Sequence, residues 1–355
     1  MGRQLQARVD LSALQHNLQR VKEIAPGKSI IAMVKANGYG HGLIEVARSL
    51  QDADGLGVAS IEEAIELRQA GIKNRIILME GFVSEQGLKN IITWQLEPVI
   101  HQVFQINLLE KYASSKLKIW VKINTGMNRL GFSDQVLLEN FSRIANSSDI
   151  MGMMTHFSDA DVLDNPKTMQ QFTKFIEITT KINKSYPCSL ANSAAILSWP
   201  VAHGDWVRPG LMLYGISPFS NSLGQDFNLK PAMTLVAKLI AINSINKNET
   251  IGYASRFICP EDMLVGVMSI GYADGYPLNA PDGTPVLLNN RRTSIIGKIS
   301  MDMTTIDLRG HQDANIGDEI ILWGNGLPIE EVAKKTGVIA WELLTSVGNR
   351  VARLY

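Results

Sequence analysis

The chain has 355 residues, of which 45% are hydrophobic and 19% charged, and its 34 basic and 34 acidic residues balance. Without net charge it has no broad positive field to bind nucleic acid or an anionic membrane, so a small molecule is the expected partner. The two cysteines, Cys188 and Cys259, stand outside any CxxC or Cys/His cluster. This pattern predicts a reducing compartment and no zinc site.

The N-terminal sequence MGRQLQARVD has no apolar core like that of a signal peptide. No uninterrupted apolar run reaches the roughly 18 residues that a membrane-spanning helix needs. We therefore expect a cytoplasmic protein that neither spans a membrane nor binds nucleic acid.

Eight short apolar segments alternate with helical patterns over residues 29–215. The predicted strands are 29–35, 56–60, 75–79, 96–100, 117–124, 150–155, 188–192 and 205–208. The predicted helices are 43–50, 61–70, 84–94, 102–113, 135–145 and 166–184. Parallel strands need crossover connections, so this alternation predicts a parallel (β/α)8 barrel, with a doubly wound open sheet as the alternative.

The pattern changes after Pro218 and predicts a second, mainly β domain. Turn-forming residues cluster at 217–228, so we place the barrel at residues 10–222 and the β domain at residues 223–355. The N-terminal residues 1–9, with a strand-like segment at 4–9, are expected to join the β domain. Its predicted strands are 233–246, 263–270, 284–288, 293–299, 303–308 and 319–323, with one helix at 328–335.

Lys35 ends the first predicted barrel strand, in the segment AMVKANGYGHG. Barrel enzymes carry their chemistry at this C-terminal end of the strands. The apolar run before Lys35 favours partial desolvation, which makes an amine better able to attack an aldehyde. The alternative is a structural lysine whose stem is buried and whose charge reaches solvent.

Two later loops suit a phosphate ester. Ser193 follows the seventh predicted strand in ANSAA, and Gly210 follows the eighth in RPGLMLYG, where it allows the backbone to approach an anion. The loops after strands seven and eight commonly bind phosphate in such barrels. Ordinary turns are the alternative for either loop taken alone.

Three more polar residues follow predicted barrel strands: Arg129 after the fifth, His156 after the sixth and Arg208 at the end of the eighth. Each is compatible with an ordinary structural role. Two arginines over an apolar barrel need partners, however, because arginine stays charged. We therefore expect all three at the same mouth as Lys35.

Eight motifs span nearly the whole chain: VKANGYGHG, TGMNRLGF, THFSDAD, ANSAA, VRPGLMLYG, IGYAS, GYADGYP and GKISMDM. In order and spacing they resemble the motifs of bacterial alanine racemases. The resemblance implies a barrel that binds pyridoxal 5'-phosphate (PLP), followed by a β domain. It also implies a homodimer whose two active sites each take residues from both subunits and act on a small amino acid.

The matched motifs imply a role for each candidate residue. Lys35 would be the Schiff-base lysine and first catalytic base, and Tyr253 the second base, which reaches the site of the partner subunit. Tyr39, Ser193, Gly210 and Leu211 would hold the phosphate. Arg208 would face the pyridine nitrogen with His156 behind it. Arg129 would contact the phenolic oxygen of the cofactor and the substrate carboxylate, helped by Met301 of the other subunit. Lys122 stands where the family often has a carbamylated lysine.

The resemblance implies interconversion of L- and D-alanine, which supplies D-alanine for peptidoglycan. Two residues depart from the motifs of some members: Asn349 replaces a tyrosine near the C-terminus, and Ser300 replaces a cysteine. These differences leave open a racemase of serine or of a broader range of amino acids. A PLP-dependent decarboxylase and a non-catalytic PLP carrier are less favoured alternatives.

Overall fold

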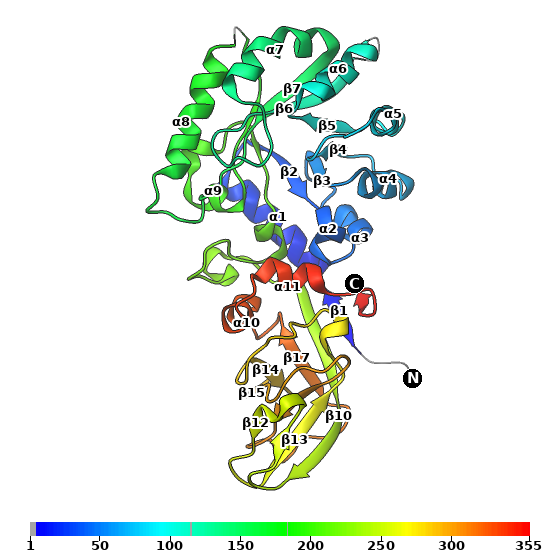
Figure 1. The fold of residues 1–355 in the computed structure, drawn as a ribbon, viewed down its shortest axis with the longest axis vertical. Coiled ribbons are helices and arrows are strands. Elements are labelled where there is room, and N and C mark those ends of the chain that lie inside the picture. The colour runs from blue at the N-terminus through cyan, green and yellow to red at the C-terminus, as the bar shows by residue number, and fades with distance from the viewer. Residues whose placement is uncertain (1–4, 114–115, 183) are drawn as a thin grey trace.

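A computed structural model describes residues 5–113, 116–182 and 184–355. Its ribbon is elongated, with a helix-surrounded barrel at one end and a β-rich part at the other (Figure 1). Among the described residues, no helix is both long and apolar enough to cross a membrane.

The first part is a closed barrel of eight parallel strands, which confirms the predicted fold class and excludes the open sheet. Each predicted strand is present, although several are shorter than expected. The strands are β2 (Ser29–Met33), β3 (Gly55–Val58), β4 (Arg75–Leu78), β5 (Glu97–Ile100), β6 (Leu117–Lys122), β7 (Ser148–Met154), β8 (Cys188–Ser189) and β9 (Trp206–Val207).

The helices of the barrel cover its outer face. They are α1 (Leu11–Ile24), α2 (Lys35–Tyr39), α3 (Leu43–Ser49), α4 (Ile61–Gln69), α5 (Glu85–Thr93), α6 (Val103–Lys111), α7 (Asp134–Ser147), α8 (Lys167–Thr180) and α9 (Ser193–Ser198). The six predicted helices are confirmed, but α8 ends at Thr180 and not at 184; residue 183 lies outside the described residues. Helices α1, α2 and α9 were not predicted.

An ion pair between Arg75 and Glu97 lies at the N-terminal ends of the barrel strands, in contact with two tryptophans. Arg75 donates two 2.7 Å hydrogen bonds to the carboxylate of Glu97, which also accepts one of 2.9 Å from the indole of Trp120. The guanidinium lies 4.9 Å from the ring centroid of Trp206. Arg75 and Glu97 therefore neutralise each other at this end.

The second part is built on an eight-stranded sheet in which the N-terminal strand takes part. Strand β1 pairs with β10 and with the C-terminal strand β18; residue 4 of the predicted segment 4–9 lies outside the described residues. The division at residues 222 and 223 stays a prediction. The strands of the sheet are β1 (Gln6–Val9), β10 (Met233–Ile245), β13 (Met263–Met268), β14 (Pro285–Leu288), β15 (Arg291–Ser294), β16 (Thr304–Asp307), β17 (Glu319–Trp323) and β18 (Ala352–Leu354).

Three details of this β-rich part differ from the prediction. Strand β15 lies at Arg291–Ser294 and not at 293–299, because Asn289 and Asn290 take positive φ values and turn the chain earlier. The predicted helix at 328–335 is present as α10 (Ile329–Thr336), but a second helix, α11 (Ala340–Ser346), was not predicted. A two-stranded ribbon, β11 (Thr250–Ile251) and β12 (Phe257–Ile258), was not predicted.

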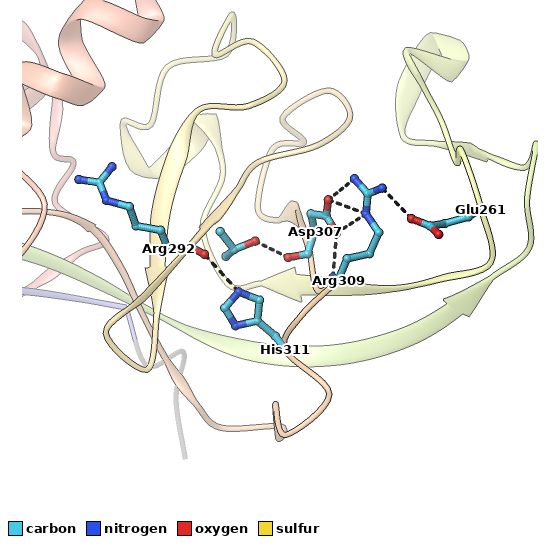
Figure 2. Close-up of polar contacts among 6 residues, drawn as sticks. Glu261, Arg292, Asp307, Arg309 and His311 are labelled. Carbon is cyan, nitrogen blue, oxygen red and sulfur yellow. Dashed lines mark hydrogen bonds and ion pairs between the residues drawn. The ribbon is translucent and has the colours of Figure 1, made fainter.

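Charges on the β-rich part are paired along its strands. Figure 2 shows the guanidinium of Arg309 between the carboxylates of Asp307 and Glu261. These hydrogen bonds raise the pKa of Arg309. His311 lies nearby, with Nε2 3.2 Å from the carbonyl oxygen of Arg292. This cluster joins neighbouring strands and loops, and we assign it a structural role.

Candidate active site

Lys35 lies at the start of α2, two residues beyond the end of β2, and not within the strand as predicted. The chain turns there because α2 is a single left-handed turn: Ala36, Asn37, Gly38 and Tyr39 have φ values of 53°, 55°, 60° and 50°. This conformation costs about 1–2 kcal/mol for each residue other than glycine. The surrounding structure must therefore hold the turn in place.

Asn37 supplies two of the contacts that hold the turn. Its backbone N–H donates to the Glu63 carboxylate over 3.1 Å, and its side-chain oxygen accepts from the backbone N–H of Leu43 over 2.8 Å. A Cβ at Gly38 would lie 2.9 Å from Cγ2 of Val46. Glycine is therefore required here by space as well as by its positive φ.

Tyr39 ends the turn and stacks on a second tyrosine below it. Its ring centroid lies 4.6 Å from that of Tyr214, whose hydroxyl donates to the Met33 carbonyl over 2.9 Å. The buried imidazole of His41 lies on the other side of Tyr214, at 4.7 Å. Burial raises the pKa of Tyr39 to about 12 and lowers that of His41 to about 4. Tyr39 therefore keeps its phenolic proton near neutral pH.

Ser193 and Gly210 meet beside Tyr39. The Ser193 hydroxyl, at the start of α9, accepts from the backbone N–H of Gly210 over 2.9 Å. A Cβ at Gly210 would lie 2.7 Å from the Tyr39 hydroxyl, so only glycine fits. Leu211 follows as the first residue of the short 3-10 helix η3 (Leu211–Tyr214). The predicted phosphate-binding residues are thus brought together by three separate loops.

Arg208 is buried after β9 and is held by hydrogen bonds from its guanidinium. Nη1 donates to the Ser189 hydroxyl over 2.6 Å, and Nη2 contacts Nδ1 of His156 at 3.3 Å. Burial lowers the pKa of Arg208 to about 10, so it stays protonated at neutral pH. Because a guanidinium only donates, Nδ1 of His156 is the acceptor and the imidazole proton lies on Nε2.

Lys122 and Arg129 line a narrow hollow together with His156. Burial, followed by the positive charges of Arg208, Arg129 and Lys35, lowers the pKa of Lys122 to about 8. Burial and the same cations lower the pKa of His156 well below its usual value. Glu80 is the carboxylate whose charge opposes this effect at Lys122. The mouth of the barrel is thus electropositive.

Tyr253 and Met301 are not part of this cluster. Tyr253 follows β11 and is 68% exposed, and Met301 is 53% exposed. Figure 1 shows β12, which comes directly after the Tyr253 turn, in the β-rich part and far from β2 in the barrel. Met301 meets a neighbouring loop of the β-rich part, since the backbone N–H of Ala273 donates to its carbonyl over 3.0 Å.

Several residues that shape the site were not predicted. His41 and Tyr214 stand inside motifs already singled out, and their aromatic character was the available signal. Ser189, which anchors Arg208, gave no signal because serine is common at strand ends. The left-handed turn itself was signalled only weakly, by Asn37 and Gly38.

Comparison with known proteins identifies the family. The family model described as "Alanine racemase, N-terminal domain" matches residues 9–218, and "Alanine racemase, C-terminal domain" matches residues 232–355. The chain is 47% identical to an alanine racemase of Coxiella burnetii over 354 residues, which covers 97% of each chain.

The chain is also similar to solved structures of alanine racemases. The biosynthetic alanine racemase from Pseudomonas aeruginosa has a TM-score of 0.94 and 40% identity, and the match covers 100% of this chain and 99% of that one. An alanine racemase from Bartonella henselae, solved with covalently bound pyridoxal phosphate, has a TM-score of 0.90 and 27% identity over 100% of both chains. The chain belongs to the alanine racemase family of isomerases.

Proposed function

We propose that this chain binds PLP at Lys35 and interconverts L- and D-alanine, thereby supplying D-alanine for peptidoglycan. The observation that carries the proposal is the electropositive barrel mouth around Lys35, joined to a compact set of phosphate donors. When bound, PLP withdraws electrons from the α-carbon of an amino acid and so acidifies its C–H bond.

The residues at the mouth fit the phosphate of PLP. The Tyr39 hydroxyl, the Ser193 hydroxyl and the N–H of Gly210 already lie side by side. Because Tyr39 stays protonated, it donates to a phosphate oxygen without adding negative charge. Ser193 donates in the same way, and the backbone N–H groups of Gly210 and Leu211 complete the set. The cations around Lys122 offset the charge of the dianion.

Arg208 suits the pyridine nitrogen. It donates a hydrogen bond but keeps its proton, so the nitrogen it faces stays unprotonated. Arg208 would therefore not supply the proton that makes a bound pyridine ring a stronger electron sink. We expect Arg208 to favour return of the proton to the α-carbon over transamination.

Inversion at the α-carbon needs one base on each face. We assign Lys35 Nζ, as the neutral amine, to remove the proton from D-alanine and the phenolate oxygen of Tyr253 to remove it from L-alanine. Each group returns its proton in the opposite direction. Tyr253 is exposed, and β12, which follows its turn, lies far from the barrel strand β2 in the same chain (Figure 1), so the proposal requires a homodimer in which each Tyr253 serves the other subunit.

His156 and Arg208 would assist that tyrosine. A free tyrosine has a pKa of about 10, which makes it a weak base at neutral pH. The neutral imidazole of His156 has its proton on Nε2 and receives a hydrogen bond from Arg208 at Nδ1. A hydrogen bond from Nε2 to the Tyr253 oxygen would stabilise the phenolate and lower the pKa of the tyrosine.

Arg129, with Met301 of the partner subunit, is assigned to the substrate carboxylate side. Lys122 lies beside it with a pKa of about 8, so a substantial fraction of its amine is neutral near physiological pH. A neutral amine adds to carbon dioxide, forms a carbamate and releases one proton. The resulting anion would form an ion pair with Arg129 and hold its side chain in place.

Labelled bicarbonate should give a carbamate carbon signal that Lys122→Ala abolishes, and an equal signal in the variant would refute the assignment.

The proposal is tested by incubating the purified protein with L-alanine and resolving the product by chiral chromatography. We expect D-alanine to accumulate until the enantiomers are equal. A yellow protein that leaves L-alanine optically unchanged would be a PLP carrier.

A panel of amino acids that includes L-serine decides between alanine as the only substrate and a broader range of substrates, which Asn349 and Ser300 leave open. The cytoplasmic location stays a prediction.

A further inference from the structure

The C-terminal strand of the β-rich part reaches the Lys35 turn through one side chain. Arg353, in β18, donates from Nε to the Gly40 carbonyl over 2.7 Å. Its other hydrogen bonds go to backbone carbonyls of its own tail: Val347 over 2.8 Å, and Gly348 and Val351 over 3.3 Å. The guanidinium thus connects two segments that lie 313 residues apart in the chain.

The tail fits closely around the residues that follow the turn. A Cβ at Gly40 would lie 2.1 Å from the carbonyl oxygen of Leu344 in α11, and one at Gly42 would lie 2.0 Å from the Tyr355 hydroxyl. Figure 1 shows α11 at the junction between the barrel and the β-rich part, beside α2 and α3 and close to the C-terminus. The end of the left-handed turn is therefore enclosed by α11 and the tail.

Arg353 is half-buried, and burial lowers its pKa. A buried guanidinium needs acceptors for its donors, and here four carbonyl oxygens provide them. Three of the four belong to the tail, so the tail alone could satisfy most of the side chain. The contact with Gly40 is the one of the four that joins the tail to the barrel loop.

We propose that Arg353 is a positioning residue for the racemase site of its own subunit. Through the Gly40 carbonyl it holds residues 35–42 in the left-handed turn, and with them the amine of Lys35 and the hydroxyl of Tyr39. The inference rests on the proposed function. The C-terminal tail then acts on the barrel of its own subunit, whereas Tyr253 acts on the partner subunit.

The chain offers a matched control in Arg68. This guanidinium also donates to four backbone carbonyls, those of Ile72, Asn74, Trp94 and Gln95, and burial also lowers its pKa. It lies at the end of α4, against the loops that enter β4 and β5, at the opposite end of the barrel. Loss of Arg68 removes comparable hydrogen bonds without touching the Lys35 turn.

The first experiment compares Arg353→Met and Arg68→Met as full-length holoenzymes. Loss of a hydrogen bond from a charged donor should speed PLP release about tenfold in Arg353→Met, whereas Arg68→Met should stay within about twofold of the wild type. Hydrogen exchange of the amides of residues 36–42 should also accelerate in Arg353→Met alone. Arg353→Lys, which reaches fewer carbonyls, should show a smaller change and serves if the methionine variant does not fold.

Wild-type rates of PLP release and exchange in the Arg353 variants would overturn the inference, and so would equal acceleration by Arg68→Met. If the wild type bound no PLP, the proposed function would fail, yet the exchange comparison would still decide whether Arg353 holds the turn.

The second experiment distinguishes action within one subunit from general destabilisation. Mixed dimers of Lys35→Ala and Tyr253→Ala chains have one complete site, whose Lys35 belongs to the Tyr253→Ala chain. Adding Arg353→Met to that chain should lower the recovered activity about tenfold. Adding it to the Lys35→Ala chain should leave the activity unchanged. Equal loss in both arrangements would contradict the inference.

Discussion

The two ends of the barrel are built in opposite ways. At the N-terminal ends of the strands, Arg75 and Glu97 form a two-point ion pair that is enclosed by tryptophans. At the C-terminal ends, Lys35, Lys122, Arg129 and Arg208 gather with Glu80 as the opposing carboxylate. The first end satisfies its charges internally, whereas the second leaves positive charge for a ligand. The proposed chemistry thus lies at the end where the positive side chains outnumber their carboxylate partners.

The largest expected effect is at Lys35. Lys35→Met should lower racemisation on the order of 10³-fold or more, because it removes both the amine that binds PLP and one of the two bases. Stability should change little, since Lys35 is only partly buried. Chiral chromatography and thermal unfolding measure the two quantities. Activity close to that of the wild type would remove Lys35 from the mechanism.

Glu97→Ala should give the reverse result at the other end. Removing one partner of this partly buried ion pair leaves Arg75 and the Trp120 indole without their acceptor and should lower the free energy of unfolding by about 2 kcal/mol. Racemisation by the folded protein should stay within about twofold of the wild type, because Glu97 lies at the far end of the strands. Urea unfolding and activity at low temperature provide the measurements. A strong loss of activity at unchanged stability would mean that the N-terminal end of the barrel contributes to catalysis and not mainly to stability.

Arg208→Glu tests how the charge at the mouth selects the reaction. A carboxylic acid that shares its proton with the pyridine nitrogen makes the cofactor a stronger electron sink, so transamination should rise roughly tenfold relative to racemisation. Arg208→Gln offers a neutral donor and no acid, and should not change the ratio in this way. Product analysis for pyruvate against D-alanine gives the ratio, and an unchanged value for Arg208→Glu would count against the assignment.

A smaller effect is expected from His156→Ala. The pKa of His156 is lowered well below 6.5, so the imidazole is neutral through the neutral range and its own titration does not shape the rate there. Its loss should remove the proposed stabilisation of the Tyr253 phenolate and shift the rising limb of the L-to-D pH profile upward by about one pH unit. The D-to-L profile, which depends on Lys35, should shift less. Identical L-to-D profiles would exclude the proposed link.

Much of the fold could be predicted from the sequence because its signals are local. Apolar periodicity indicated the eight barrel strands, and turn residues indicated most strands of the β-rich part. The left-handed turn could not be predicted, because distant residues such as Glu63 and Arg353 hold it in place. For the same reason the strand before Lys35 ends earlier than its apolar pattern indicates.

The candidate site was predictable to a similar extent. Lys35, Tyr39, Ser193 and Gly210 could be proposed from their places after strands and from the family motifs, and the structure brings them together. The partners of Arg208 could not, because contacts such as that to Ser189 depend on packing between neighbouring strands. The proposed action of Tyr253 in the site of a second subunit is equally invisible to local patterns.

The central claim is that each active site combines Lys35 of one subunit with Tyr253 of the other. It is tested most directly by mixing inactive Lys35→Ala and Tyr253→Ala chains under conditions in which subunits exchange. Random pairing makes about half of the dimers hybrid, each with one complete site, so about a quarter of the wild-type activity should return. No recovery despite demonstrated exchange would contradict the shared site.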